Sequence, residues 1–272
     1  MAWVLYNDNY RKNDDVHLSI HERICRYGDG LFETMMCDND TIKYYDYHWQ
    51  RLHEGMVYFG FKPNASFTQN NVYEKVMQLI AKNTLQGIKT KIRLRVWRNG
   101  EGLYSPLENS ISYLIECVPC TIPKSMINIG VSQCVQLAHT PYSKYKTCNS
   151  LPYIAAAVEK SNRNLDDLII TDNQGNISEA IASNIFWVKD GMVFTPSLQA
   201  GCIAGVMRRA VTERLKSSHI IVLEQMTNIE VLYGAEIVFL TNISGISYVA
   251  MLDHTRYNIN LIIPYENILM NI

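Results

Sequence analysis

Hydrophobic and polar residues alternate in short runs along the first 118 residues, and these runs predict strands and helices in mixed order. Residues 91–97 alternate with a period of two, so one face of the predicted strand is apolar and the other is basic. Two further runs flank Asp38, Asn39 and Asp40, a pattern typical of a β-hairpin. Asp46 is expected to cap a helix. The predicted strands are 31–37, 41–45, 91–97 and 110–118, and the predicted helices are 47–58 and 69–82.

A second set of elements follows a stretch that contains Pro119 and Pro123 and is typical of a linker. We therefore predict a small N-terminal α+β domain at 1–118, a linker at 119–124 and a larger C-terminal domain at 125–272. Because the elements are mixed without regular βαβ spacing, the sequence predicts an α+β fold with antiparallel pairing. In the second domain we expect strands at 127–135, 167–171, 184–189, 219–225, 236–241 and 246–252, helices at 151–162 and 206–217, and a C-terminal amphipathic segment.

The composition is that of a packed globular protein and argues against several functional classes. Of the 272 residues, 47% are hydrophobic and 19% are charged, which argues against disorder. The 25 Lys and Arg residues nearly balance the 26 Asp and Glu residues, so the sequence lacks the positive charge that a nucleic-acid surface needs. No stretch resembles a signal peptide or a membrane span, and seven cysteines without tandem spacing are typical of reduced thiols. We expect a soluble, cytoplasmic protein that binds neither nucleic acid nor membrane.

Common catalytic and metal-binding motifs do not account for the sequence. It contains no Gly-x-Gly-x-x-Gly at a strand-to-helix turn, no Walker-type phosphate loop and no Gly-x-Ser-x-Gly elbow. Cys117 and Cys120 form a single C-x-x-C pair, whereas a structural zinc site requires four ligands. His17 and His21 are four residues apart but lack the glutamate of a metalloprotease helix. No metal is expected.

Four segments, taken together and in order, indicate a different chemistry. The first is a glycine-flanked turn that leads into a strand, at 26–34, and the second is Trp49-Gln50-Arg51-Leu52, which puts an arginine on a helix. The third segment, 146–151, puts Lys146 in irregular backbone directly before a helix. The fourth contains Glu179 in the run 177–186 and continues in the glycine-containing helix start at 201–208.

In this order the segments resemble the fold-type IV enzymes of pyridoxal 5′-phosphate (PLP), the class IV aminotransferase family. This family includes branched-chain and D-amino-acid aminotransferases and 4-amino-4-deoxychorismate lyase. The resemblance extends from about residue 27 to residue 249. It implies a homodimer of two-domain α+β subunits with a D-amino-acid aminotransferase-like fold, with PLP between the domains and the active site at the dimer interface. The implied substrate is a small, amino-acid-like molecule.

The resemblance assigns a residue to each functional part of PLP. Lys146 is implied as the catalytic Schiff-base lysine, which also moves a proton as general acid and base. Lys144 is its nearby rival but lacks the Lys-x-x-Asn-x-Leu context. Glu179 is implied as the second catalytic residue, a carboxylate opposite the pyridine nitrogen. Arg51 resembles the phosphate-binding arginine of the family, because a guanidinium fork suits phosphate oxygens.

The helix start at residue 206 is expected to bind the same phosphate. The N–H groups of Val206 and Met207 can point at an anion, and the helix dipole favours negative charge there. Many relatives have threonine where this sequence has Met207, so a hydroxyl contact is lost and phosphate binding rests more on Arg51. Thr241 and Asn242 are further candidates for polar contacts with the cofactor.

Substrate recognition is expected from the N-terminal domain. The loop 98–106 is similar to a loop of the lyase that ends in Tyr-Ser, although it departs from that loop in part. Arg95, Arg98 and Tyr104 are therefore candidates for binding substrate carboxylates, and Phe32 is expected to form an apolar wall of the pocket.

Three local features resemble the lyase subgroup in particular: Met207 within 205–208, the run 182–187, and Thr241-Asn242 followed by Gly245-Ile246. We predict an enzyme of the aminodeoxychorismate lyase type, which releases 4-aminobenzoate and pyruvate for folate biosynthesis. The alternative within the family is an amino-acid aminotransferase, branched-chain or D-specific. The alternative from another class is a catalytically silent, PLP-free relative or binding protein.

Overall fold

Two compact units make up the chain, and the division between them falls inside the predicted linker. The computed structural model describes residues 2–262, 265 and 268–269. Unit 1 consists of the described residues of Met1–Thr121 together with Tyr145–Asn149, and unit 2 consists of Ile122–Lys144 and the described residues of Ser150–Ile272. Tyr145–Asn149 departs from the prediction, which put all of 125–272 in the second domain. The reason is backbone pairing with unit 1, described below.

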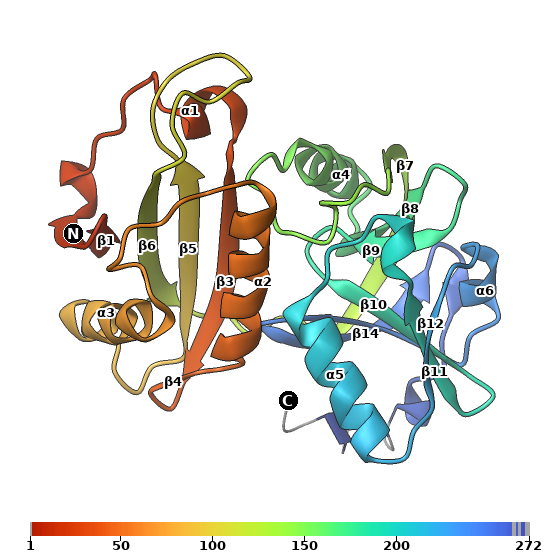
Figure 1. The fold of residues 1–272 in the computed structure, drawn as a ribbon. Coiled ribbons are helices and arrows are strands. Elements are labelled where there is room, and N and C mark those ends of the chain that lie inside the picture. The colour runs from red at the N-terminus through yellow and green to blue at the C-terminus, as the bar shows by residue number, and fades with distance from the viewer. Residues whose placement is uncertain (1, 263–264, 266–267, 270–272) are drawn as a thin grey trace. The chain divides into compact units, whose positions relative to one another are not determined.

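Unit 1 contains a six-stranded antiparallel sheet with the order β2-β1-β6-β5-β3-β4. Its strands are β1 Trp3–Tyr6, β2 Asn9–Lys12, β3 Gly30–Asp38, β4 Thr41–Ile42, β5 Thr90–Arg98 and β6 Ile111–Pro119. Its helices are η1 Asn13–Asp15 (3₁₀), α1 Arg23–Tyr27, α2 Tyr45–Tyr58 and α3 Gln69–Lys82. Helix α2 runs along β3 (Figure 1).

Helix α2 begins earlier than the sequence predicts. Its N-cap is Tyr44, which adopts a left-handed conformation with φ of 53°, and Asp46 therefore lies in the first turn instead of capping the helix. A negative charge in the first turn still complements the helix dipole. Helix α3 has a regular N-cap, because the side chain of Thr68 accepts a hydrogen bond from the N–H of Asn71 at 3.3 Å.

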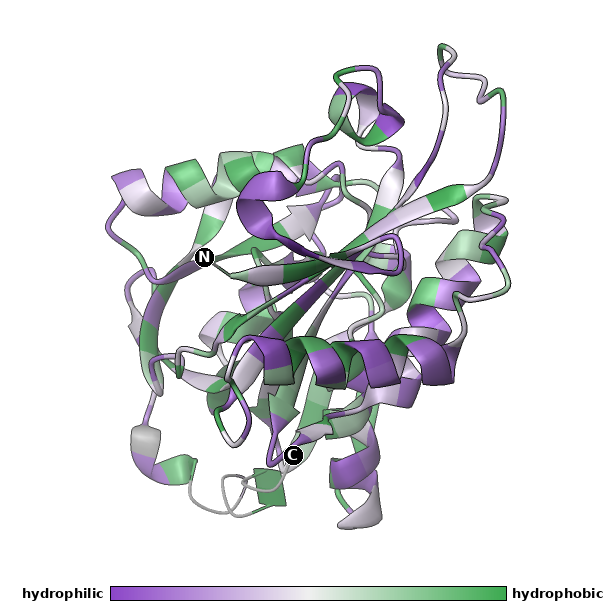
Figure 2. Ribbon diagram, turned by 90° about the vertical axis from the view of Figure 1, so that its left-hand side faces the viewer, coloured by the Kyte–Doolittle hydropathy of each residue, from purple (hydrophilic) through white to green (hydrophobic). Residues whose placement is uncertain are grey.

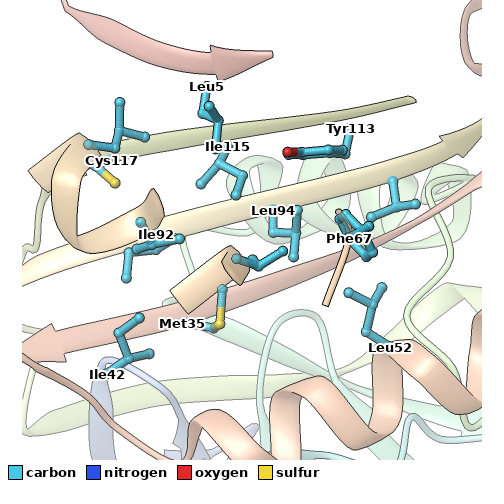
Figure 3. Close-up of a cluster of buried hydrophobic side chains, with 14 of the residues drawn as sticks. Leu5, Met35, Ile42, Leu52, Phe67, Ile92, Leu94, Tyr113, Ile115 and Cys117 are labelled. Atoms are coloured by element: carbon cyan, nitrogen blue, oxygen red, sulfur yellow. The ribbon is translucent and has the colours of Figure 1, made fainter. Parts of the chain in front are cut away.

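The core of unit 1 lies where the sheet is covered by its helices. Leu31 and Met35 of β3 lie opposite Val96 and Ile92 of β5, and all four are buried. They join the buried residues of α2 and α3 in one hydrophobic cluster, part of which is drawn in Figure 3. Because side chains alternate along a strand, Glu33 falls on this same covered face, between two apolar neighbours.

Unit 2 contains a nine-stranded sheet with the order β12-β11-β10-β13-β14-β7-β8-β9, and β15 pairs with β14. Three of its pairings, β11 with β12, β14 with β7 and β7 with β8, are parallel, so the predicted antiparallel pairing holds only in part. The strands are β7 Met126–Leu137, β8 Asp167–Asp172, β9 Ile177–Ala180, β10 Asn184–Lys189, β11 Met192–Pro196, β12 Val222–Gln225, β13 Ile237–Asn242, β14 Gly245–Leu252 and β15 Thr255–Arg256.

The helices of unit 2 are α4 Leu151–Asn162, η2 Leu198–Ala200, α5 Val206–Ser217, α6 Glu230–Tyr233 and η3 Ile259–Leu261. Helices α4 and α5 contact the sheet, α4 at β7 and β8 and α5 at β10, β12 and β13, and shorter helices complete the unit. Val211 and Leu215 of α5 are fully buried in one cluster with Phe186 and Phe239 of the sheet. The helices in Figure 2 accordingly carry both hydrophobic and hydrophilic residues. The predicted C-terminal amphipathic segment lies partly outside the described residues.

Among the helices that the structure describes, none has the length and apolar character needed to cross a bilayer. The described residues also include no group of three or more His, Cys, Asp or Glu side chains placed to hold a metal ion.

Candidate active site

Lys146 lies in a short segment that extends the sheet of unit 1. Thr147 forms an antiparallel bridge with Leu31 of β3. The backbone N–H of Phe32 donates to the carbonyl oxygen of Lys146 at 2.9 Å. Residues 145–149 thus pair with β3 as an additional strand would, and the position of Lys146 is fixed by its backbone.

The amine of Lys146 lies beside two of the predicted substrate residues. Its Nζ atom is 4.3 Å from the centroid of the Phe32 ring. Phe32 lies directly opposite Arg95 of β5, so these two side chains share the sheet face that the hydrophobic core does not occupy. The Arg95 guanidinium is 39% exposed and lies 3.4 Å from the carboxylate of Glu116. Unit 1 therefore brings Lys146, Phe32 and Arg95 together.

Arg51 is held on α2 by a buried carboxylate of β3. Nε of Arg51 donates to Oε1 of Glu33 at 2.7 Å, and Nη2 donates to Oε2 at 2.6 Å. Nδ1 of His48 lies 2.7 Å from the same Oε2 atom. Glu33 and His48 are 1% and 2% exposed. Their spacing of three residues puts His48 and Arg51 on one face of α2, so both reach the same carboxylate.

The charges of this group are well defined. Burial by itself would raise the pKa of Glu33, but the positive charge of Arg51 and the hydrogen bond with His48 outweigh it and bring the pKa to about 2. Burial lowers the pKa of His48 and its interactions with Glu33 raise it, while the charges of Arg51 and Lys146 lower it, so that the net shift is downward. Since an ionised carboxylate only accepts, neutral His48 carries its proton on Nδ1. Its Nε2 atom is buried without a hydrogen-bond partner among the described residues.

Arg98 does not occupy the position expected of a substrate contact. It lies three residues after Arg95 on β5 and, because side chains alternate, points to the other face of the sheet. It is 6% exposed, donates from Nε to Asp29 at 3.0 Å and from Nη2 to the carbonyl of Phe59 at 2.8 Å, and also contacts Asn109. Its donors are used inside unit 1, so Arg98 is a structural residue at the base of its loop and not the predicted substrate contact.

Tyr104 lies in the loop that follows β5 and is 89% exposed. Its ring contacts the ring of Tyr27, with 5.7 Å between the centroids. Arg23 anchors this loop: it donates from Nη1 to the carbonyl of Leu103 at 2.7 Å and from Nε to Asp29 at 2.7 Å. The loop is therefore held through the backbone next to Tyr104, while the Tyr104 side chain is exposed.

Glu179 lies on β9 of unit 2, where two donors fix its carboxylate. The hydroxyl of Tyr153 on α4 donates to Oε1 at 2.6 Å, and the backbone N–H of Ile203 donates to Oε2 at 3.3 Å. The Glu179 residue is 6% exposed. Burial and the neighbouring Glu179 raise the pKa of Tyr153, so the phenol keeps its proton and remains a donor.

Val206 and Met207 are the first two residues of α5, as predicted for an anion-binding helix start. Gly205 precedes them as the N-cap and provides no side-chain cap. The first N–H groups of a helix have no partner within the helix, so they can bind an anion. Gly205 comes so close to Asn184 of β10 that a Cβ atom would lie 1.8 Å from the Asn184 Oδ1 atom. Any larger residue at this position would force the Asn184 side chain to move.

Thr241 and Asn242 end strand β13 beside the same residue. Thr241 pairs with Asn184 across the two strands, and Nδ2 of Asn184 donates to the carbonyl of Thr241 at 2.8 Å. Nδ2 of Asn242 donates to Oγ of Ser183 at 3.0 Å. Within unit 2, the loop that leads to α5 thus contacts both Glu179, through Ile203, and the Asn184–Thr241 pair.

The sequence carries a weak signal for two further residues of these groups, His48 and Glu33, and none for two others, Tyr153 and Asn184. His48 precedes Arg51 by three residues on a helix, and Glu33 is the single charged position inside an apolar strand. Tyr153 and Asn184 had no pattern of their own, because their partners are distant in the chain.

Comparison with known proteins places the chain in a family. The sequence model of the family described as Amino-transferase class IV matches residues 30–249, which include every residue predicted for the site. The chain belongs to the class IV aminotransferase family, a family of PLP-using enzymes.

The proteins similar to this chain include both aminotransferases and a lyase. The chain is 24% identical to the branched-chain-amino-acid aminotransferase of Escherichia coli strain K12 over 251 residues, covering 88% of this chain and 81% of that protein. It is 26% identical to the aminodeoxychorismate lyase of Vibrio harveyi over 205 residues, covering 74% of each. A crystal structure of the Escherichia coli branched-chain aminotransferase superposes with a TM-score of 0.87 at 25% identity, covering 95% of this chain and 88% of that one.

Proposed function

We propose that this protein is a PLP-dependent enzyme with Lys146 as its reactive amine and that it acts as an aminodeoxychorismate lyase. The observation that carries the proposal is the position of Lys146 in unit 1, held by its backbone on β3 with its Nζ atom over Phe32. An amine on an apolar ring, in the same unit as a carboxylate-held arginine, is suited to an anionic aldehyde cofactor.

The residues fit the chemical parts of PLP. Arg51 and the N–H groups of Val206 and Met207 would hold the phosphate, and Glu179 would hold the protonated pyridine nitrogen. The fit is supported by two observations: Glu179 has its carboxylate fixed by two donors, and Gly205 leaves no Cβ at the start of α5. When bound, PLP supplies an aldehyde for amines and a ring that withdraws electrons from the carbon bearing the amine.

The chain's own residues would then do three things. Lys146 would move a proton to and from the carbon that bears the substrate amine, as general base and then general acid. Glu179 would keep a positive charge on the pyridine nitrogen opposite its carboxylate. Arg95 and Tyr104 would contact the substrate carboxylates, and Phe32 would form an apolar wall beside the Lys146 amine.

The lyase reaction is favoured by the helix start at Gly205-Val206-Met207-Arg208. The methionine offers no hydroxyl where many relatives have threonine, and this feature resembles the lyase subgroup. Similarity to the Vibrio harveyi lyase supports the same proposal. The test is release of 4-aminobenzoate from aminodeoxychorismate, followed by its fluorescence, with pyruvate measured in a coupled assay. Competent holoenzyme that releases neither product would remove the lyase assignment.

A second candidate is an amino-acid aminotransferase, branched-chain or D-specific. It is favoured by the similarity to the Escherichia coli branched-chain enzyme, which covers more of this chain than the lyase match does. A panel of L- and D-amino donors with 2-oxoglutarate or pyruvate as acceptor separates the two candidates. Keto-acid formation without 4-aminobenzoate release would assign the protein to this class.

We further propose a homodimer, as the family resemblance implies, which sedimentation of the holoenzyme would test.

The remaining alternative is a silent relative that binds no PLP. Protein that stays colourless after PLP is added, and yields no borohydride-stable adduct on Lys146, would support that alternative and end the present proposal.

A further inference from the structure

Glu33 occupies an unusual place for a carboxylate. It lies on the helix-covered face of β3, is 1% exposed, and belongs to the layer of the unit 1 core. Burying an ionised carboxylate is strongly unfavourable unless strong partners compensate. A hydrophobic residue would fill this position at lower cost, so the charge calls for an explanation beyond packing.

Its partners are arranged around one side chain, Arg51. Glu33 accepts two nearly parallel hydrogen bonds from Nε and Nη2 of Arg51, at 2.7 and 2.6 Å. This bidentate geometry fixes both the plane and the direction of the guanidinium. One edge of the fork is thereby turned to Glu33, and Nη1 belongs to the opposite edge.

His48 provides a further hydrogen bond to the Glu33 carboxylate. Its Nδ1 atom lies 2.7 Å from Oε2 of Glu33, the oxygen that Nη2 of Arg51 also contacts. Neutral His48 donates this hydrogen bond without adding a second positive charge near Arg51. The net charge of the three side chains is therefore zero, with Glu33 prevented from rotating away from the arginine.

We propose that Glu33, supported by His48, is the positioning residue that aims the Nη1 edge of the Arg51 guanidinium at the PLP phosphate and so gives this enzyme its preference for a phosphorylated cofactor. This inference rests on the proposed function. A merely structural ion pair would contribute to the stability of unit 1 but would not discriminate between PLP and pyridoxal, which lacks the phosphate.

The experiment measures that discrimination directly. Full-length apoenzyme is titrated with PLP and, separately, with pyridoxal, and the ratio of the two dissociation constants is the phosphate selectivity. Glu33→Gln is close to isosteric and removes the charge. We expect it to lower the selectivity at least tenfold, through weaker PLP binding with pyridoxal binding changed by less than twofold. Inorganic phosphate should compete with PLP for binding to the wild type more strongly than for binding to this variant.

Matched variants separate positioning from folding. Glu54→Gln, on an exposed face of the same helix as Arg51, should leave the selectivity unchanged. His48→Leu should lower it about threefold, whereas His48→Asn, whose amide nitrogen can replace Nδ1, should restore it. Arg51→Lys should lower the selectivity as much as Glu33→Gln, and the double variant should lose little more. Should Glu33→Gln fail to fold, the His48 pair and Arg51→Lys still carry the test.

Two outcomes overturn the inference alone: unchanged selectivity in Glu33→Gln, or equal weakening of PLP and pyridoxal in the folded variants. Failure of the proposed function would look different. In that case the wild-type protein itself would bind PLP no better than pyridoxal and would give no borohydride-stable adduct on Lys146.

Discussion

In unit 1 the polar groups of the candidate site are held by other charged side chains, whereas in unit 2 they are held by uncharged donors and one close glycine. Arg51 depends on the Glu33 carboxylate and Arg98 on Asp29. Glu179 instead accepts from the N–H of Ile203 and from one phenol, and the start of α5 offers backbone N–H groups alone.

This difference has a physical consequence for mutation. Removing one member of a buried ion pair leaves the other charge without compensation, so substitutions in unit 1 should be costly. In unit 2 a substitution removes at most one uncharged donor while the backbone donors remain, so the groups there should tolerate substitution better than those in unit 1. Their weak point is steric, at Gly205, where an added methyl group collides with Asn184.

The largest expected effect comes from Lys146, because its side chain is the proposed reactive amine while its backbone pairs with β3. Lys146→Ala should lower turnover by at least about 10³-fold, because the general base is lost. Thermal unfolding should change little, since the hydrogen bond between residues 146 and 32 involves only the backbone. Lys144→Ala, measured in the same product assay, is the matched control and should keep its activity. An active Lys146→Ala enzyme would show that the reactive amine lies elsewhere.

Two arginines of one strand sharpen the comparison within unit 1. Arg98→Ala should lower the free energy of unfolding by about 2–3 kcal/mol, because Asp29 and the Phe59 carbonyl lose a buried partner. Arg95→Ala should cost less than about 1 kcal/mol, since its pair with Glu116 is exposed, but should raise the KM for the substrate. Urea unfolding and steady-state kinetics measure the two effects. A rise in KM with unchanged stability for Arg98→Ala would reverse these assignments.

The arginine pair also shows what the sequence could and could not predict. Both residues lie in the correctly predicted strand 91–97 and its continuation, and the two-residue period already puts positions 95 and 98 on opposite faces. The resemblance to the family predicts both as substrate contacts, because the family loop follows them. Local periodicity was the better guide to their orientation.

Local sequence patterns do not predict contacts between residues that are distant in the chain. Strands β1 and β2 were not predicted, because β1 is an apolar run of only four residues, β2 is polar, and the local sequence does not show that β1 pairs with β6. Strand β12 is shorter than the predicted 219–225. Residues 145–149 were assigned to the second domain by chain order, whereas pairing of Thr147 with Leu31 puts them in unit 1.

In unit 2, Gly205→Ala is expected to break the site without removing any polar group. The new Cβ would displace the Asn184 side chain from Thr241, costing about 1–3 kcal/mol of stability and weakening PLP binding. Asn184→Ala combined with Gly205→Ala should recover part of that loss, because the collision is relieved. Gly234→Ala is the control, since its nearest neighbouring atom would be 3.7 Å away. Additive unfolding energies for the double variant would contradict the steric argument.

The smallest effect concerns pH, where the two units should respond in opposite directions. Glu33 has a pKa of about 2, below its ordinary value of 4.5, so its contribution to stability is present above pH 4.5 and is lost as the pH falls toward 2. Asp167 in unit 2 behaves in the reverse sense. Burial raises its pKa from 3.8 to about 6, although the N–H groups of Leu168 and Ile181 that bind its Oδ1 atom lower it.

For Asp167, the folded protein binds the proton more tightly than the unfolded chain does. Its contribution to stability is therefore complete below about pH 3.8 and is lost as the pH rises through 6. Asp167→Asn keeps an oxygen for both N–H groups but carries no charge, so it should stabilise the protein at pH 8 by about 1 kcal/mol and change little at pH 4. Urea unfolding at the two pH values measures this, with Asp190→Asn, on an exposed turn, as the control. An equal gain at both pH values would mean that the carboxylate of Asp167 does not titrate in this range. The two units would then differ in how they hold the groups of the candidate site, but not in how their stability responds to pH.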